Sequence, residues 1–184
     1  IEKIYEPYYE RFANKLEGFF TDEPQITREG IPWSFVFEEE YRKRYQDDIK
    51  NHLEELFLNQ GDYVTTRFRF WKMVTDLFSS AYMKQIYDWC EQHNLKLTGH
   101  LLREENMMIQ LPVNGACMPH YEYFHIPGMD WLGRDIFDCL TAKQVSSVAE
   151  QLGMEQVISE TYALCGHNIS FDELKGIYEW QMVR

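Results

Sequence analysis

The sequence lacks the signatures of several large protein classes. No apolar run approaches the roughly 18 residues that a membrane-spanning helix needs, and no basic segment followed by an apolar one opens the chain. None of the 10 glycines forms a GxGxxG or P-loop pattern, and no GxSxG elbow is present. We therefore expect no membrane span, no phosphate cradle and no serine-nucleophile elbow.

Cysteine is scarce, and its spacing matches no disulfide scaffold and no CxxC pair. We expect the four cysteines to be reduced thiols in or near the core: Cys90, Cys117, Cys139 and Cys165. Reduced thiols favour a cytoplasmic location. Secretion stays open, because Ile1 is not a natural start and we expect the chain to be part of a longer protein.

Positive charge is also in short supply. The 18 Lys and Arg residues face 30 Asp and Glu residues, giving a net charge of −12. Such a balance argues against nucleic acid and against an anionic membrane surface as partners. A neutral ligand such as a carbohydrate fits better.

Apolar residues, in contrast, are plentiful: 45% of the 184 residues are hydrophobic and 16% are aromatic. We expect one globular domain over residues 1–184, with a helical insertion at about 35–62. Each predicted strand is followed by a helical pattern, which indicates a parallel α/β sheet. Four strands are too few to close a (β/α)8 TIM barrel, so the pattern predicts a partial barrel. The strands are expected at 19–23, 95–100, 123–126 and 157–160.

Local patterns add further predictions. Ile4, Tyr8, Phe12 and Leu16 recur at steps of four, which predicts one buried face of an amphipathic helix. The segment 103–119 is predicted as a loop, with Glu104 and Glu105 solvated. A long helical pattern spans 64–93, and capping boxes at Thr141–Gln144 and Ser170–Glu173 predict two helix starts.

Polar residues gather where the predicted strands end. Glu23, His100, Asp130 and Glu160 occupy these ends, and Asp22 precedes the first of them. In a parallel α/β barrel, the carboxyl ends of the strands form the face that carries the chemistry. Glycoside cleavage needs a protonated carboxyl and an ionised carboxylate on either side of a sugar ring. The pattern therefore predicts Glu23 and Glu160 as a catalytic pair.

The motifs FFTDEP, LTGH, IPGMD and SETY, in this order, resemble the barrel domain of the large bacterial α-L-rhamnosidase-like glycoside hydrolases. The resemblance implies that these strands are four to seven of a TIM barrel, with Glu23 as proton donor and Glu160 as base or nucleophile. It also implies an inverting, calcium-dependent reaction, although no calcium ligand can be matched here. Asp22 departs from the family, in which Asn often holds the sugar 2-hydroxyl.

Further residues are candidates for substrate binding. His100 is suited to donating to a sugar hydroxyl, and Asp130 beside Trp131 to a hydroxyl clamp with an aromatic platform. Trp33, Tyr162 and His167 are candidate pocket walls. Each has a structural alternative: a salt-bridging acid, a histidine bonded to backbone, a turn or a core aromatic.

The function predicted is a glycosidase acting on a plant or microbial carbohydrate, an α-L-rhamnoside being one option, with no cofactor assigned. Two alternatives stay open. One is a non-catalytic carbohydrate-binding or scaffolding half barrel, whose edge strands need the rest of the barrel or a second chain to cover them. The other is a metal-dependent hydrolase with its metal at His100 or His120, although Cys117, His120 and His125 match no zinc spacing.

Overall fold

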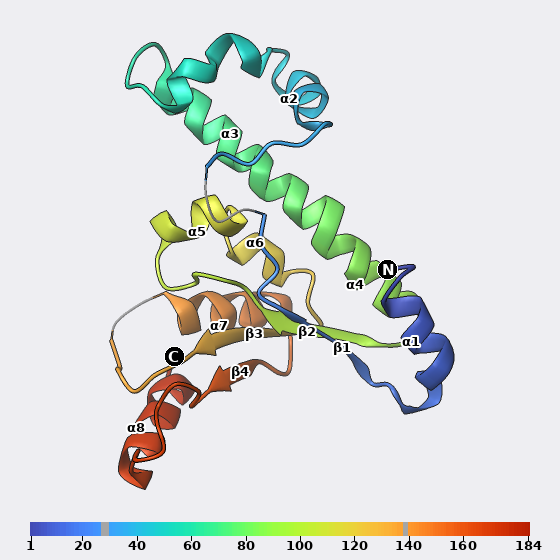
Figure 1. Ribbon diagram of the computed structural model, residues 1–184, viewed down its shortest axis with the longest axis vertical. Helices are drawn as coiled ribbons and strands as arrows, with labels where there is room; N and C mark the ends of the chain where they lie inside the picture. The colour runs from blue at the N-terminus through green and yellow to red at the C-terminus, as the bar shows by residue number, and fades with distance from the viewer. Residues whose placement is uncertain (27–29, 138–139) are drawn as a thin grey trace.

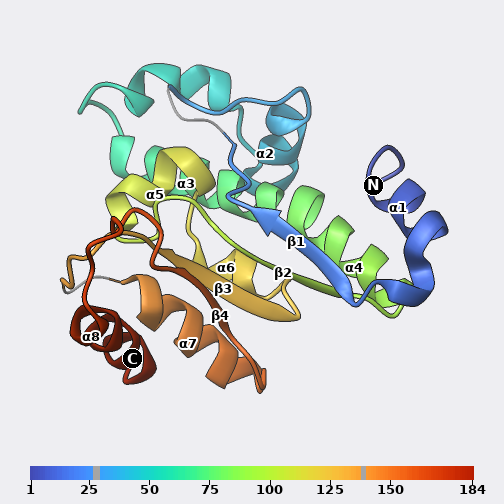
Figure 2. The ribbon, with the colours of Figure 1, turned by 60° about the horizontal axis from the view of Figure 1, so that its bottom comes forward.

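The chain folds around a four-stranded parallel sheet (Figure 1). A computed structural model describes residues 1–26, 30–137 and 140–184. The strands follow one another in chain order from edge to edge (Figure 2). Their register pairs Asp22 with His100 and Asp130 with Glu160, so the polar ends predicted from the sequence lie along one edge. The strands are β1 (Gly18–Asp22), β2 (Lys96–His100), β3 (Ile126–Trp131) and β4 (Ile158–Thr161).

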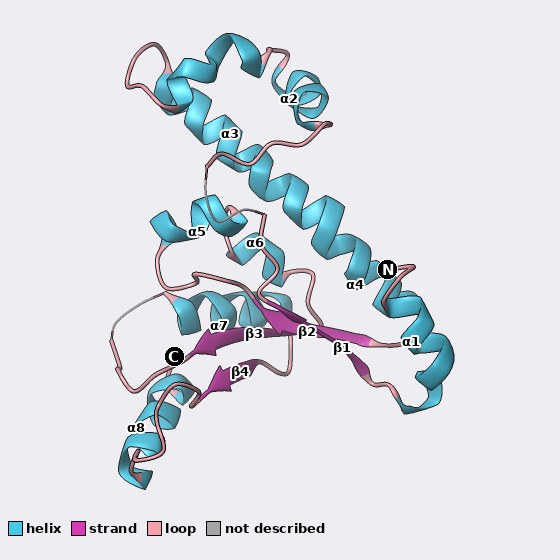
Figure 3. Cartoon of the chain, viewed as in Figure 1, coloured by secondary structure: helices cyan, strands magenta, loops and turns pink. Residues whose placement is uncertain are grey.

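Helices connect the strands, as the alternation in the sequence predicted (Figure 3). The predicted helix at 64–93 is confirmed as one long rod that runs through α3, a π-helical turn η3 and α4. The helical elements are α1 (Tyr5–Phe12), the 3-10 helix η1 (Ala13–Lys15), α2 (Phe37–Tyr45), the 3-10 helix η2 (Ile49–Leu56), α3 (Tyr63–Phe78), η3 (Ser79–Met83), α4 (Lys84–Gln92), α5 (Met107–Asn114), α6 (Met118–Tyr121), α7 (Thr141–Leu152) and α8 (Phe171–Met182).

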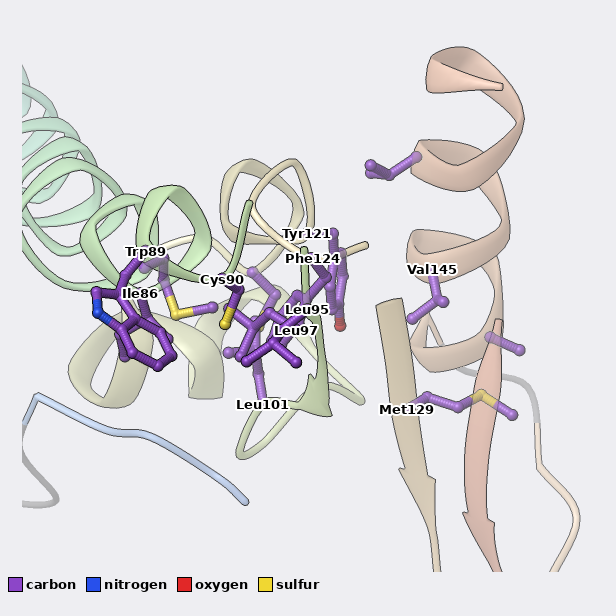
Figure 4. Close-up of a cluster of buried hydrophobic side chains, with 14 residues drawn as sticks. Ile86, Trp89, Cys90, Leu95, Leu97, Leu101, Tyr121, Phe124, Met129 and Val145 are labelled. Atoms are coloured by element: carbon purple, nitrogen blue, oxygen red, sulfur yellow. The ribbon is translucent and has the colours of Figure 1, made fainter. Parts of the chain in front are cut away.

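The main core lies between one face of the sheet and the helices α4, α6 and α7 (Figure 4). Leu97 of β2 and Met129 of β3 point into it, and α4 and α7 contribute Trp89 and Val145. Because successive side chains of a strand face opposite ways, His100 and Asp130 lie on the other face. The core thus fixes the strands from one side and leaves the polar residues on the other.

A second core supports the segment between β1 and α3. Phe37 and Tyr41 of α2, Ile49 of η2, and Phe70 and Val74 of α3 are all buried together. In Figure 1 this segment stands away from the sheet as an arm at the end of the long helical rod. The helices of the arm fill most of the range in which an insertion was predicted.

The first helix packs with a different face from the one predicted. Ile4 and Tyr8 are 61% and 55% exposed. Tyr5 and Tyr9 contact Trp89 instead, with ring centroids 5.8 Å away in both cases. The step-of-four pattern continued through residues 1–16, but α1 ends at Phe12, and Tyr5 and Tyr9 are its residues that pack against the core.

The prediction for β3 was also wrong, because the strand continues through Pro127 and Gly128 to Trp131. The strand was expected at 123–126, ending before Pro127 and Gly128, with a turn at these residues as an alternative. Gly128 is needed in the strand because a Cβ at this position would overlap the Gly99 carbonyl and the Ile158 side chain. Asp130 therefore lies within the strand, not after it.

Two other local predictions were wrong, while a third is confirmed. The segment expected as a loop contains α5 and α6. The capping box at Thr141 is absent, because the helix has Leu140 as N-cap and the Gln144 side chain points into the interior. The box at Ser170 is present, with Glu173 N–H donating to Ser170 Oγ at 3.2 Å.

Three of the cysteines, Cys90, Cys117 and Cys165, are buried free thiols, whereas Cys139 lies outside the described residues. Among the described residues, no helix has both the length and the apolarity to cross a membrane.

Candidate active site

His100 is the centre of the polar cluster at the strand ends. Its side chain is 1% exposed, and its Nε2–H donates to Glu160 Oε2 at 2.9 Å. Asp22 Oδ1 lies 3.5 Å from the same nitrogen. Since a carboxylate only accepts hydrogen bonds, the proton of this tautomer is on Nε2. The structure therefore brings together Asp22, His100 and Glu160 from β1, β2 and β4.

Asp130 and Glu23 lie against the same imidazole. Atoms of Glu23, His100 and Asp130 that could ligate a metal are all within 4.8 Å of one another. Glu23 follows β1 with a left-handed backbone, φ 46°, which turns the chain away from the strand before Pro24. Glu23 and Glu160, 137 positions apart in the sequence, thus surround one histidine.

The crowding of carboxylates changes the acidity of Asp130. The pKa of Asp130 is raised from 3.8 to about 6, chiefly by burial; the nearby His100 lowers it, and the charges of Glu160, Glu23 and Asp22 add to the rise. Its Oδ1 is buried without a hydrogen-bond partner among the described residues. Asp130 therefore holds its proton to a higher pH than an ordinary aspartic acid does.

A hollow of about 270 Å³ opens beside these residues. We call it the acid hollow, because four of its lining side chains are carboxylic acids. Arg103 is its basic residue. The lining residues are Glu23, Leu101, Leu102, Arg103, Glu104, Glu105, Val113 and Asp130.

Glu104 was predicted to be solvated, and this prediction was wrong. The side chain is 3% exposed and accepts hydrogen bonds from Leu101 N–H, Tyr121 O–H and Asp130 N–H. Burial raises its pKa to about 7, and these hydrogen bonds oppose the rise. The signal that could have found it is the one that found His100, since Glu104 comes only four residues after the end of β2.

The loop that carries Glu104 is held by buried amides. Gln110 and Gln144 both donate to the Glu104 carbonyl, at 2.9 and 2.8 Å. Asn114 donates to the carbonyl of Leu102. Side chains from α5 and α7 therefore hold the backbone of Leu102 and Glu104, which lines the acid hollow, in one conformation.

Two groups of side chains have the spacing to hold a metal ion: Asp22, His100 and Glu160, and Glu23, His100 and Asp130. Both use His100 and supply only two carboxylates each. Calcium takes six to eight oxygen ligands, whereas imidazole suits zinc and other transition metals. These groups do not fit the calcium that the family resemblance implies. His120, the other candidate ligand, is buried and uses both ring nitrogens, bonded to Ser79 Oγ and the Asn114 carbonyl.

Four predicted pocket residues lie elsewhere. Trp33 lines a separate apolar hollow of about 280 Å³ beside α3, with Phe37, Phe78 and Tyr82. Trp131 is 4% exposed and packs on Trp180 and Phe137, so it offers no open platform. Tyr162 O–H donates to the Leu174 carbonyl in α8, and His167 is exposed.

Comparison with known proteins shows a similarity in structure but none in sequence. No family model matches the sequence, and no curated protein matches it. A solved structure of a rhamnosidase from Novosphingobium sp. PP1Y is similar, with a TM-score of 0.61 and 17% identity over 82% of this chain. The chain spans only 15% of the length of that rhamnosidase. It therefore shares a distant rhamnosidase-like fold over a part of that enzyme.

Proposed function

We propose that this chain carries the catalytic edge of a glycoside hydrolase, with its sheet forming strands four to seven of a (β/α)8 barrel. The observation that carries the proposal is the convergence of Glu23, Asp130 and Glu160 on the buried imidazole of His100. The fold similarity to a glycosidase adds support. The substrate class is a neutral carbohydrate, an α-L-rhamnoside being the first to test.

The chemistry needs one carboxyl to protonate the departing oxygen and one carboxylate to act at the other side of the sugar. Glu160 suits the second role, because the hydrogen bond from His100 Nε2–H orients its carboxylate. Depending on whether it activates water or attacks the sugar, the reaction inverts or retains the anomeric configuration.

Two carboxyl groups can supply the proton. Glu23 is the donor that the order of motifs implies, and it lines the acid hollow. Asp130 lines the same hollow, and its pKa of about 6 keeps it partly protonated near neutral pH. We assign Glu23 as donor and Asp130 as a binding residue for a sugar hydroxyl, with Asp22 beside them.

Leaving groups of different acidity test this assignment. Glu23→Gln should abolish hydrolysis of alkyl glycosides, which need protonation, while sparing 4-nitrophenyl glycosides. Asp130→Asn should reduce the hydrolysis of both by a similar factor. If the two variants exchange these behaviours, Asp130 is the donor. Equal loss on both substrates in both variants counts against a glycosidase with either donor.

The alternative of a non-catalytic half barrel makes a different demand. A scaffolding domain has no need to keep its strand-end acids together, and Glu23 and Glu160 would be free to point apart. Their shared contact with His100 favours the enzymatic proposal.

A further inference from the structure

One buried carboxylate joins the ends of two strands. Glu104 Oε1 accepts from the N–H of Leu101, the residue after His100, at 3.1 Å, and from Tyr121 O–H at 2.6 Å. Glu104 Oε2 accepts from the N–H of Asp130 at 3.0 Å. The two backbone positions that it connects are those from which the imidazole and the Asp130 carboxyl extend towards each other.

We propose that Glu104 is a positioning residue that fixes the end of β2 against β3 and thereby sets the placement of Asp130 relative to His100. Its effect on rate rests on the proposed glycosidase function, whereas its effect on the backbone does not. The pairing of β2 with β3 does not by itself hold these two strand ends together. It joins Thr98 to Ile126 and Gly99 to Pro127, and stops before His100 and Asp130.

The chemistry of the three donors explains why an acid is required. Two N–H groups and one O–H converge on the same side chain, and a carboxylate offers only acceptors. An amide in its place would direct an NH2 group at one of the two backbone N–H donors. That buried N–H would lose its acceptor, and the strand end could move.

Glu104 is itself held in place. Its carbonyl accepts from Gln110 of α5 and Gln144 of α7. Hydrogen bonds from two helices therefore fix the position of Glu104 independently of the strands β2 and β3, whose ends it joins. This is the arrangement expected of a supporting residue around a reactive site.

Glu104→Gln tests the proposal, with Glu105→Gln as the matched control. Replacing Glu105, the next residue, removes the same charge from the same hollow, and its buried Oε2 has no hydrogen-bond partner among the described residues. We expect Glu104→Gln to speed hydrogen exchange of one of the two backbone amides, that of Leu101 or that of Asp130, by at least about tenfold, because that amide loses its acceptor. In Glu105→Gln both amides should exchange at the wild-type rate.

The kinetic readout separates positioning from a merely structural role. We expect Glu104→Gln to lower kcat by about 10-fold to 100-fold with KM changed by less than about threefold, since hydrogen bonds to a sugar hydroxyl strengthen in the transition state and a small displacement of Asp130 weakens them there most. If Glu104→Gln does not fold, Glu104→Asp gives the same readouts, because its shorter side chain cannot reach both strand ends.

Two results would overturn the proposal: unchanged exchange of both the Leu101 and the Asp130 amides in the variants of Glu104, or faster exchange with kcat and KM both unchanged in an active enzyme. A wild-type protein inactive on every glycoside overturns the proposed function instead, while the exchange rates of these two amides still decide the clamp.

Discussion

Asp130→Asn should make the protein more stable above neutral pH. Burial and three neighbouring carboxylates raise the pKa of Asp130 from 3.8 to about 6, so the folded state disfavours its ionised form. A shift of this size corresponds to about 3 kcal/mol at 1.36 kcal/mol per pH unit. Asp130 is only partly buried, and solvent screening reduces this to about 1–2 kcal/mol. Asparagine keeps the shape of the side chain and cannot ionise.

The sign of the pH dependence follows from proton linkage. Between pH 4 and 6 the folded state holds a proton that the unfolded chain has released, so the stability of the wild type falls as pH rises through this window. Below about pH 4 the side chain is neutral in both states. The advantage of the variant should therefore be near zero at pH 4 and complete at pH 7 to 8.

Urea denaturation at pH 4 and pH 8, with a chelator present so that no cation neutralises the cluster, measures this difference. Asp135→Asn is the control, because Asp135 is exposed and its replacement should change stability by less than about 0.5 kcal/mol at either pH. A destabilised Asp130→Asn protein at pH 8, or an equal gain at both pH values, would refute the reasoning.

Three other substitutions test the fold. Gly99→Ala should lower the free energy of unfolding, measured by urea denaturation, by more than about 2 kcal/mol, because φ of Gly99 is 146° and the new Cβ would overlap the Thr21 carbonyl. A urea midpoint equal to that of the wild type would contradict the close approach of β1 and β2. Ser170→Ala should lower stability by about 1 kcal/mol through loss of the capping box, and an unchanged melting temperature would argue against that cap. Phe70→Ala should lower the free energy of unfolding by about 3–5 kcal/mol and should reduce hydrogen-exchange protection in α2 and α3 more than in β2. An equal loss of protection in all three elements would contradict a separate core in the arm.

The sequence predicted the sheet well because parallel strands and helices differ in period and in their end signals. It also brought out His100, Asp130 and Glu160, since the carboxyl ends of parallel strands share one edge. Periodicity could not predict which turn of α1 reaches the core, because that depends on where Trp89 lies.

Residues outside the strand ends were harder to predict. Trp33 and Trp131 were candidates because of their places in the chain, one in the loop after the first strand and the other beside Asp130. Long-range packing places Trp33 in an apolar hollow and buries Trp131. Glu104 was missed because its partners, Tyr121 and Asp130, are 17 and 26 positions away. A buried carboxylate and a solvated one look alike in a sequence until their donors are known.

The rate of glycoside hydrolysis tests the central claim most directly. For the full-length protein, kcat/KM on a panel of 4-nitrophenyl glycosides that includes the α-L-rhamnoside should fall by about 10³-fold or more in Glu160→Gln, because the oriented carboxylate is lost. Ser170→Ala should keep the wild-type rate, because Ser170 caps α8 and is not among the residues that line the acid hollow. A Glu160→Gln protein that hydrolyses these substrates as fast as the wild type would contradict the account.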